Sequence, residues 1–480
     1  MRRTVPSHLA LTAAALLAGL GTIKLYVPAF SLWVLIGAAL LVATWPKRKD
    51  IGKALANLNY RIYLPWIVFV VAIAAAAIFN DLPVGDRLFS LGTILKFIVI
   101  AAAMALLICM RLTRQHLEDV LTGVMILAAL GFAVAILNDD WLMRYGDGRL
   151  AWTLAWAGVF WKVGIFALPF FVWRAMVSPS WPELPRLSLA LLIVALDGSR
   201  TGFLAAITVV VVATFIAMIF VRSFSWARGL GLCALSAIVC YLWLQPTIAF
   251  LIAQGGAGRW ISAFAMVSLA TSVVLSRTEF GAYGSRGIRH YKSLMLALGL
   301  GLLIATLLAA VSFVGANVLL EGEPGKSIAY SANDTTEGLT VVAVDRLTRQ
   351  DETRLQMLSK GWEGAVAHFP IGGGLGTTKS NDNGTQVHIH MTYLQLLSDV
   401  GVVGLLSYLA IFGSILLWFL RLDRLSRLYA VPVMAIPGIY LLQGMFTPLS
   451  NEMTEWFPVI LAASVMYGLA HGLTKADGVT

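Results

Sequence analysis

Apolar runs separated by short polar turns make up most of the chain. The runs lie near residues 8–24, 28–45, 63–79, 90–110, 118–137, 151–175, 187–198, 202–221, 229–252, 261–276, 295–318, 394–420, 430–449 and 456–473. Most of them reach the length of roughly 17 or more residues that a helix needs to cross the hydrocarbon core of a bilayer. The pattern predicts an all-α, polytopic transmembrane helical protein with about 12–14 spans.

Two stretches leave the number of spans open. Leu187 to Val221 is too long for one crossing and contains the polar turn Asp197–Gly198–Ser199–Arg200, which predicts a short helix followed by a full one. The runs 229–252 and 261–276 fit either two crossings or a re-entrant or tilted pair.

A single long polar segment, Glu321 to Tyr393, interrupts the late spans. It divides the chain into an N-terminal transmembrane helical bundle (1–320), a loop domain (321–393) and C-terminal transmembrane helices (394–480). Within the loop, apolar residues at helical spacing predict a helix over Ala343–Ala367, ended by Pro370 and the glycine run Gly372–Gly376. A further helix is expected to begin near His390 and to continue as the next span.

Composition agrees with a membrane protein and excludes two other classes. The chain is 59% hydrophobic and 12% charged, which is more apolar than a soluble protein of 480 residues could bury. The net charge of +10 collects at alternate membrane exits, so it is not a nucleic-acid signature. The positive-inside rule puts both termini in the cytoplasm and the loop outside, which is the periplasm in a Gram-negative bacterium. Cys109, Cys233 and Cys240 fall in apolar segments and indicate neither a disulfide framework nor a zinc site.

Arginines at the membrane surface are the first candidates for chemistry. Arg200 lies at a predicted outward-facing turn, where it either pairs with Asp197 or grips a phosphate with its planar guanidinium, helped by the adjacent helix N-terminus. Arg354 shares the predicted loop helix with Arg346 and Arg349. A solvated helix face accounts for most of these charges, and Arg354 is the one for which we favour a functional role.

His390 lies where the loop returns to the membrane, close to a predicted helix N-terminus. The helix dipole there disfavours the protonated imidazole, so the ring suits a general base that activates a hydroxyl. A metal site built from His388, His390 and His368 is the rival interpretation, and a structural role is another. No carboxylate at suitable spacing joins these histidines, so we expect neither a metal nor a cofactor.

Other polar positions are weaker candidates. The Gly372–Gly376 run lacks the Lys-Ser/Thr ending of a P-loop and predicts a tight turn with close backbone packing. Asp139–Asp140 either caps a loop or binds a metal. Lys96 and Lys162 fall inside predicted spans, where they either snorkel toward the interface or attract a lipid phosphate.

Three segments together resemble the O-antigen ligase and O-antigen polymerase superfamily of bacterial membrane glycosyltransferases. The segment 199–204 is similar to the family's Ser-Arg segment at a periplasmic turn. Residues 354–376 are similar to its stretch of an arginine, a tryptophan, a proline and glycines. His390, followed after ten residues by Gly401 and then by Gly404, is similar to the ligase pattern, although Met391 stands where a small polar residue is usual.

The resemblance implies a metal-independent, inverting transferase at the periplasmic face of the inner membrane. Its donor would be O-antigen glycan on undecaprenyl diphosphate, and its acceptor a hydroxyl of the lipid A–core oligosaccharide. His390 would act as general base, while Arg200 and Arg354 would bind the diphosphate and stabilise its growing charge. Further contacts with substrate are expected from Arg346, Arg349, His388, Lys96 and Tyr393.

Three alternatives stay open at this point. An O-antigen polymerase or a protein O-oligosaccharyltransferase would use the same lipid-linked donor. A transporter or flippase is more distant, because such proteins typically carry inverted repeats and the sequence has no such symmetry. In every case the expected partners are membrane lipids and lipid-linked substrates, with no nucleic acid.

Overall fold

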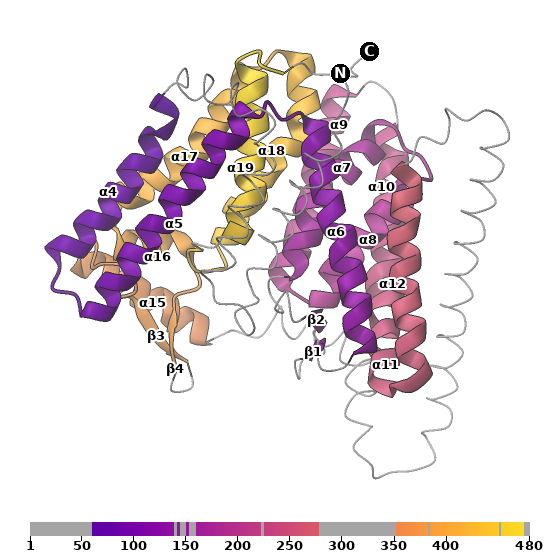
Figure 1. The fold of residues 1–480 in the computed structure, drawn as a ribbon, viewed down its shortest axis with the longest axis horizontal. Helices are drawn as coiled ribbons and strands as arrows, with labels where there is room; N and C mark the ends of the chain where they lie inside the picture. The colour runs from indigo at the N-terminus through magenta and orange to yellow at the C-terminus, as the bar shows by residue number, and fades with distance from the viewer. Residues whose placement is uncertain are drawn as a thin grey trace, which may run out of the picture. The chain divides into compact units, whose positions relative to one another are not determined.

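A computed structural model describes residues 60–138, 142–144, 150–152, 160–221, 225–277, 352–382, 385–450 and 453–474. The described residues fall into two compact units, one with the described residues before 121 and after 349 and one with those from 121 to 349 (Figure 1). The predicted spans 8–24, 28–45 and 295–318 lie outside the described residues, as do Asp139, Asp140, Arg346 and Arg349. The same holds for the predicted domain boundary at 320/321, whereas the boundary at 393/394 falls inside a helix.

Eight helices in the described part of the chain are long and apolar enough to cross a membrane. They are α5 (Val84–Cys109), α6 (Arg114–Leu137), α7 (Phe160–Val177), α9 (Arg200–Phe220), the continuous run of α10 (Ser225–Ile238), η5 (Val239–Leu244) and α11 (Gln245–Gln254), α12 (Gly256–Arg277), α17 (Gly401–Arg421) and α18 (Arg424–Gly444). Two shorter apolar helices, α4 (Leu64–Phe79) and α19 (Met453–Ala470), match predicted spans. By length and composition, these are the helices of a multi-pass membrane protein, as the apolar runs predicted.

The first unit packs α4, α5, α17, α18 and α19 around aromatic rings. Trp456 of α19 is fully buried, and its ring centroid lies 5.0 Å from that of Tyr440, 5.3 Å from Trp66 and 5.6 Å from Phe97. Tilted and edge-on rings at such distances stabilise helix packing beyond the area that they bury. Because these rings come from four different helices, they fix the frame that carries the site described below.

The second unit is built on α7 and α8 (Glu183–Asp197), which are buried along nearly their whole length. Gly164 of α7 allows the close approach, because a Cβ atom there would clash with the carbonyl group of Ala190. The predicted break at 197–200 is confirmed. Gly198 ends α8 in the left-handed conformation (φ 64°), and the Ser199 hydroxyl caps α9 by accepting from the Gly202 N–H at 3.3 Å.

The structure corrects two of the predicted helices and adds two short hairpins. The start of the span predicted over 151–175 is a strand: β2 (Leu150–Trp152) pairs antiparallel with β1 (Leu142–Arg144), and the described part of the helix, α7, runs from Phe160. The span predicted over 394–420 is split into α16 (Thr392–Asp399) and α17, because Gly401 takes a positive φ of 79°. A second hairpin, β3 (Lys379–Asp382) with β4 (Thr385–His388), was not predicted either; apart from these two short hairpins the described fold is helical, as predicted.

Candidate active site

The glycine-rich loop is bound to the end of α16. The N–H groups of Gly373 and Gly374 donate to the carbonyl oxygens of Ser398 and Asp399, both at 2.8 Å. The N–H of Val402 in α17 donates in turn to the carbonyl of Pro370 at 3.0 Å. These bonds hold the loop against the junction of α16 and α17.

Glycine is required where the loop meets this junction. Gly372 and Gly401 both have positive φ values, 87° and 79°. A Cβ atom on Gly372 would lie 2.5 Å from the amide nitrogen of Gly401, and one on Gly401 would clash with the backbone of Pro370 and Ile371. The glycine run is therefore the predicted tight turn with close backbone packing, and packing alone explains these two residues.

A buried carboxylate, Asp399, organises the same loop. Its Oδ2 accepts the N–H of Gly376 at 3.1 Å, and its Oδ1 accepts the N–H of Thr378 at 3.1 Å and the hydroxyl of Thr377 at 3.3 Å. Burial raises the pKa of Asp399, and these hydrogen bonds oppose that rise only in part. Sequence reasoning missed Asp399, although an acidic residue inside the apolar run 394–420 was a usable signal.

His390 lies two residues before α16, on a backbone that is anchored on both sides. Ile389 before it is fully buried beneath Gly361 of α15 (Glu352–Ala367), and Thr392 after it donates its hydroxyl to the Thr447 carbonyl at 2.8 Å. The His390 ring itself is exposed, with Nδ1 3.2 Å from the sulfur of Met357 in α15. An exposed imidazole on a fixed backbone can exchange a proton with a bound molecule.

His388 faces a different neighbourhood from His390. It closes β4 opposite Lys379, and its ring stacks on Phe89 of α5, with centroids 6.1 Å apart. The Nζ of Lys379 lies 3.7 Å from a carboxylate oxygen of Asp86 in the first turn of α5. The buried Nδ1 of His388 has no hydrogen-bond partner among the described residues. His388 is therefore held mainly by its strand and its ring stack.

Tyr393 joins α16 to α18. Its hydroxyl donates to the carbonyl of Leu441, and the neighbouring Gln395 accepts the N–H of Leu449 at 2.8 Å. Burial raises the pKa of Tyr393 to about 12, so the phenol stays protonated and able to donate at neutral pH. The Tyr393 hydroxyl thus contacts α18, which gives Tyr393 a role in packing the helices.

The remaining predicted residues lie on separate elements. Arg354 belongs to the first turn of α15, one turn before Met357. Lys96 is half-buried near the middle of α5, seven residues and so about 10 Å along the helix from Phe89. Arg200 is the first residue of α9 and belongs to the other unit. The structure thus brings His390 beside the helix α15 that also carries Arg354, whereas His388 lies against α5.

Asp197, the alternative partner weighed for Arg200, is fully buried. Its Oδ2 accepts the backbone N–H of Trp161 at 2.9 Å, where α7 begins. Asp197 therefore ties α8 to the start of α7.

The histidines were also considered as metal ligands. His368, just beyond the end of α15, has Nδ1 3.0 Å from the Gly364 carbonyl. Within the ranges that the structure describes, no group of three or more His, Cys, Asp or Glu side chains is placed to hold a metal ion.

Comparison with protein-family models and with curated proteins finds no match to this chain. The functional interpretation therefore depends on the residues, their geometry and the resemblance noted in the sequence.

Proposed function

We propose that this chain is a membrane glycosyltransferase of the O-antigen ligase type. It would transfer O-antigen glycan from undecaprenyl diphosphate to a hydroxyl of lipid A–core at the periplasmic face of the inner membrane. The observation that carries the proposal is the exposed His390 ring on an anchored backbone, between α15 and the start of α16. A general base must be held in place while its ring stays open to the substrate, and His390 meets both conditions.

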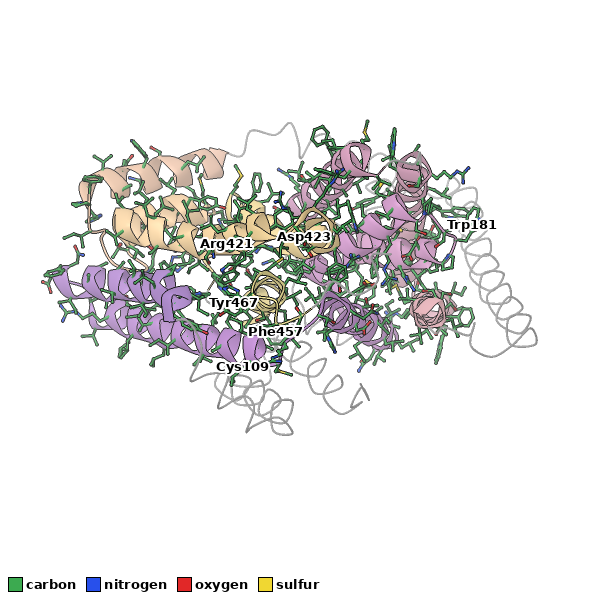
Figure 2. The ribbon with its side chains drawn as sticks, turned by 90° about the horizontal axis from the view of Figure 1, so that it is seen from above. Cys109, Trp181, Arg421, Asp423, Phe457 and Tyr467 are labelled. Carbon is green, nitrogen blue, oxygen red and sulfur yellow. The ribbon has the colours of Figure 1, made fainter. Side chains whose placement is uncertain are left out.

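The basic residues at the ends of two helices support a site on the periplasmic side of the membrane. Arg421 and Asp423 lie close together at the turn between α17 and α18 (Figure 2), and Arg424 follows them as the first residue of α18. This turn is at the opposite end of α17 from α16. Arg111 and Arg114 likewise follow the end of α5, whose other end carries Phe89 beside His388. The positive-inside rule assigns these basic turns to the cytoplasm, so both helices favour a periplasmic site.

The chemistry follows from the donor. No nucleotide pool exists in the periplasm, so the energy must reside in the bond between the anomeric carbon and the diphosphate. In the proposed step, His390 takes the proton of the acceptor hydroxyl, and the hydroxyl oxygen forms a bond to the anomeric carbon. The bond from that carbon to undecaprenyl diphosphate breaks, with inversion. Arg354, on the same unit as His390, would stabilise the charge on the departing diphosphate through planar, bidentate contacts.

The rigid surroundings fit this role. Asp399 and the glycine loop hold the C-terminal end of α16, while Tyr393 and Gln395 fix its middle to α18 and the following turn. A displacement of the base by about 1 Å can cost a hundredfold in rate. Much of the hydrogen bonding near His390 therefore serves to position it.

A reconstituted reaction tests the proposal. The purified protein is incubated with undecaprenyl-diphosphate-linked glycan and lipid A–core, with EDTA and without ATP. We expect glycan on lipid A–core, and a loss of roughly 10² to 10⁴ in rate for His390→Ala. The matched control is His471→Ala, because His471 is also exposed but lies beyond the C-terminal end of α19, stacked on Tyr467. This control should retain wild-type activity.

Each other outcome contradicts a specific part of the proposal. Near-normal transfer by folded His390→Ala protein would remove the general base. Glycan that lengthens on the undecaprenyl carrier, with none on lipid A–core, would identify a polymerase. Activity that appears only with an added divalent cation would overturn the metal-independent step.

A further inference from the structure

Helix α15 carries three different faces. Met357, Gly361 and Ala365 are buried. The small Gly361 lets the helix approach α16, because a Cβ atom there would lie 2.7 Å from side-chain atoms of Ile389 and Leu394. A second face, beside the buried one, is exposed but apolar. The third face is exposed and polar. The apolar face is therefore not used to pack α15 onto its own unit.

The exposed row, which we call the apolar stripe, consists of Leu358, Trp362 and Val366, followed beyond the helix by Phe369 and Ile371. Its members within the helix are four residues apart, so they lie along one side of α15. Trp362 is 62% exposed and Phe369 is 69% exposed. Large exposed apolar residues gathered in this way mark a surface that contacts a membrane or another protein.

The stripe leads to the outer surface of a membrane-embedded helix. The carbonyl of Gly372, next to Ile371, accepts a hydrogen bond of 2.8 Å from the Asn80 side chain at the end of α4. Ile78 and Phe79, the last two residues of the apolar helix α4, are themselves strongly exposed. The stripe is thus continuous with apolar surface that lies at the lipid-facing end of a span. Figure 1 shows α15 with α16 and the β3–β4 hairpin at this end of the unit, where α4 turns into α5.

The polar face of α15 completes the pattern of an interfacial helix. Ser359, Lys360 and Glu363 are exposed and bond to one another, with Lys360 Nζ 3.0 Å from Glu363. A helix with an apolar side bearing tryptophan and a charged side lies in the plane of a membrane surface, with the apolar side sunk into the boundary of headgroups and acyl chains. A water-soluble loop helix would have no reason to keep both tryptophan and phenylalanine in water.

We propose that α15 is an interfacial membrane helix and that the partner of the apolar stripe is the phospholipid bilayer. The stripe is immersed at the leaflet where α4 ends, while the Lys360–Glu363 face points to water. This goes beyond the proposed transferase activity and does not depend on it. It also sets the depth of Met357, and hence of the His390 ring beside it, at the membrane surface, where a lipid-linked molecule presents its headgroup.

Site-directed spin labelling tests this arrangement without an activity assay. The full-length protein is placed in phospholipid nanodiscs with a nitroxide at Val366→Cys or at its neighbour Ala367→Cys, which is exposed on the polar side of the same helix. The native cysteines are buried, and unsubstituted protein carried through the labelling gives the background. Collision rates are then measured with oxygen, which concentrates in lipid, and with a water-soluble nickel chelate.

We expect the ratio of oxygen to nickel accessibility to be high at 366 and low at 367. The pair Leu358→Cys and Ser359→Cys, eight residues earlier on the same helix, should show the same contrast. The result therefore does not depend on the folding of a single variant. Equal, nickel-accessible labels at 366 and 367 would show that the stripe faces water and would overturn the proposal. A label at 366 that neither reagent reaches would show a protein covering the stripe, from this chain or a second copy, and would also overturn it.

Discussion

The two units bury polar groups for different purposes. In the second unit, Glu183 and Arg186 of α8 form a buried ion pair at 2.7 Å, and Arg186 also reaches Ser276 of α12. The buried Asp197 of α8 accepts the backbone N–H of Trp161 in α7. These groups join one helix to another inside a packed core. Each partner serves the packing of that unit.

In the first unit, the buried network leads to an exposed group. Asp399 binds the glycine loop, and Tyr393 and Thr392 bind α18 and the turn beyond it, yet His390 beside them is exposed. Hydrogen bonds among buried groups stabilise the fold. Where they also hold the backbone beside an exposed side chain, they fix the position of that side chain as well. The comparison therefore separates residues whose loss should lower stability alone from residues whose loss should also disturb the proposed chemistry.

The largest effect on stability is expected from Glu183→Ala in the second unit. Removing the carboxylate breaks this buried ion pair with the Arg186 guanidinium, which should cost about 3–5 kcal/mol. Glu363→Ala is a matched control, because Glu363 also has a cation three residues away, Lys360, but that pair is exposed. Thermal unfolding in detergent should show a large drop for Glu183→Ala and no measurable change for Glu363→Ala. Equal shifts in the two variants would contradict the distinction.

A smaller effect is expected from Gly401→Ala, at the junction of α16 and α17. The alanine would have to hold a positive φ of 79° with its Cβ against the backbone of Pro370 and Ile371, so we expect a loss of about 2 kcal/mol. Gly413→Ala in the same α17 is the control, because a Cβ there meets no other atom within 4 Å. It should be neutral or stabilise the helix by up to about 1 kcal/mol.

The Gly401→Ala experiment also probes the link to function. If the glycine loop positions His390 through α16, then folded Gly401→Ala protein, assayed well below its unfolding temperature, should lose glycan transfer while Gly413→Ala keeps it. Unchanged transfer by a destabilised Gly401→Ala protein would show that the junction contributes stability only.

Much of the helical architecture could be predicted from the sequence, because a bilayer imposes a length on every apolar run. The break at 197–200 was also predictable, since Gly198 and Ser199 are strong signals for ending and starting a helix. The break at 400–401 was missed because its cause is a long-range contact. Gly401 adopts a positive φ at the point where the distant Pro370 approaches, and no local pattern reveals that approach.

The site was predictable only in its residue types. The histidine at 390 and the glycine run at 372–376 could be recognised, but the loop is held by a bond between Asp399 and Thr378, which meet only after the loop folds back. The hairpin that carries His388 has polar strands with no apolar alternation, so the usual signal for a strand is absent. The role of Tyr393 in packing was equally hidden, because its partner is a backbone carbonyl of α18.

The smallest effect is expected from Asp399→Asn, and its dependence on pH is the informative part. Asn keeps the shape but turns an amide toward one of the N–H donors, so the variant should lose about 1 kcal/mol. Because burial raises the folded-state pKa of Asp399 above its usual 3.8, the folded wild type binds a proton more tightly than the unfolded chain does. The contribution of Asp399 to the free energy of unfolding is therefore fully present below pH 3.8, and it is lost as the pH rises through the folded-state pKa. Unfolding midpoints in detergent across this range should show the advantage of wild type over Asp399→Asn shrinking as pH rises. An advantage that grows with pH would mean that the N–H donors outweigh burial and that the folded state prefers the carboxylate.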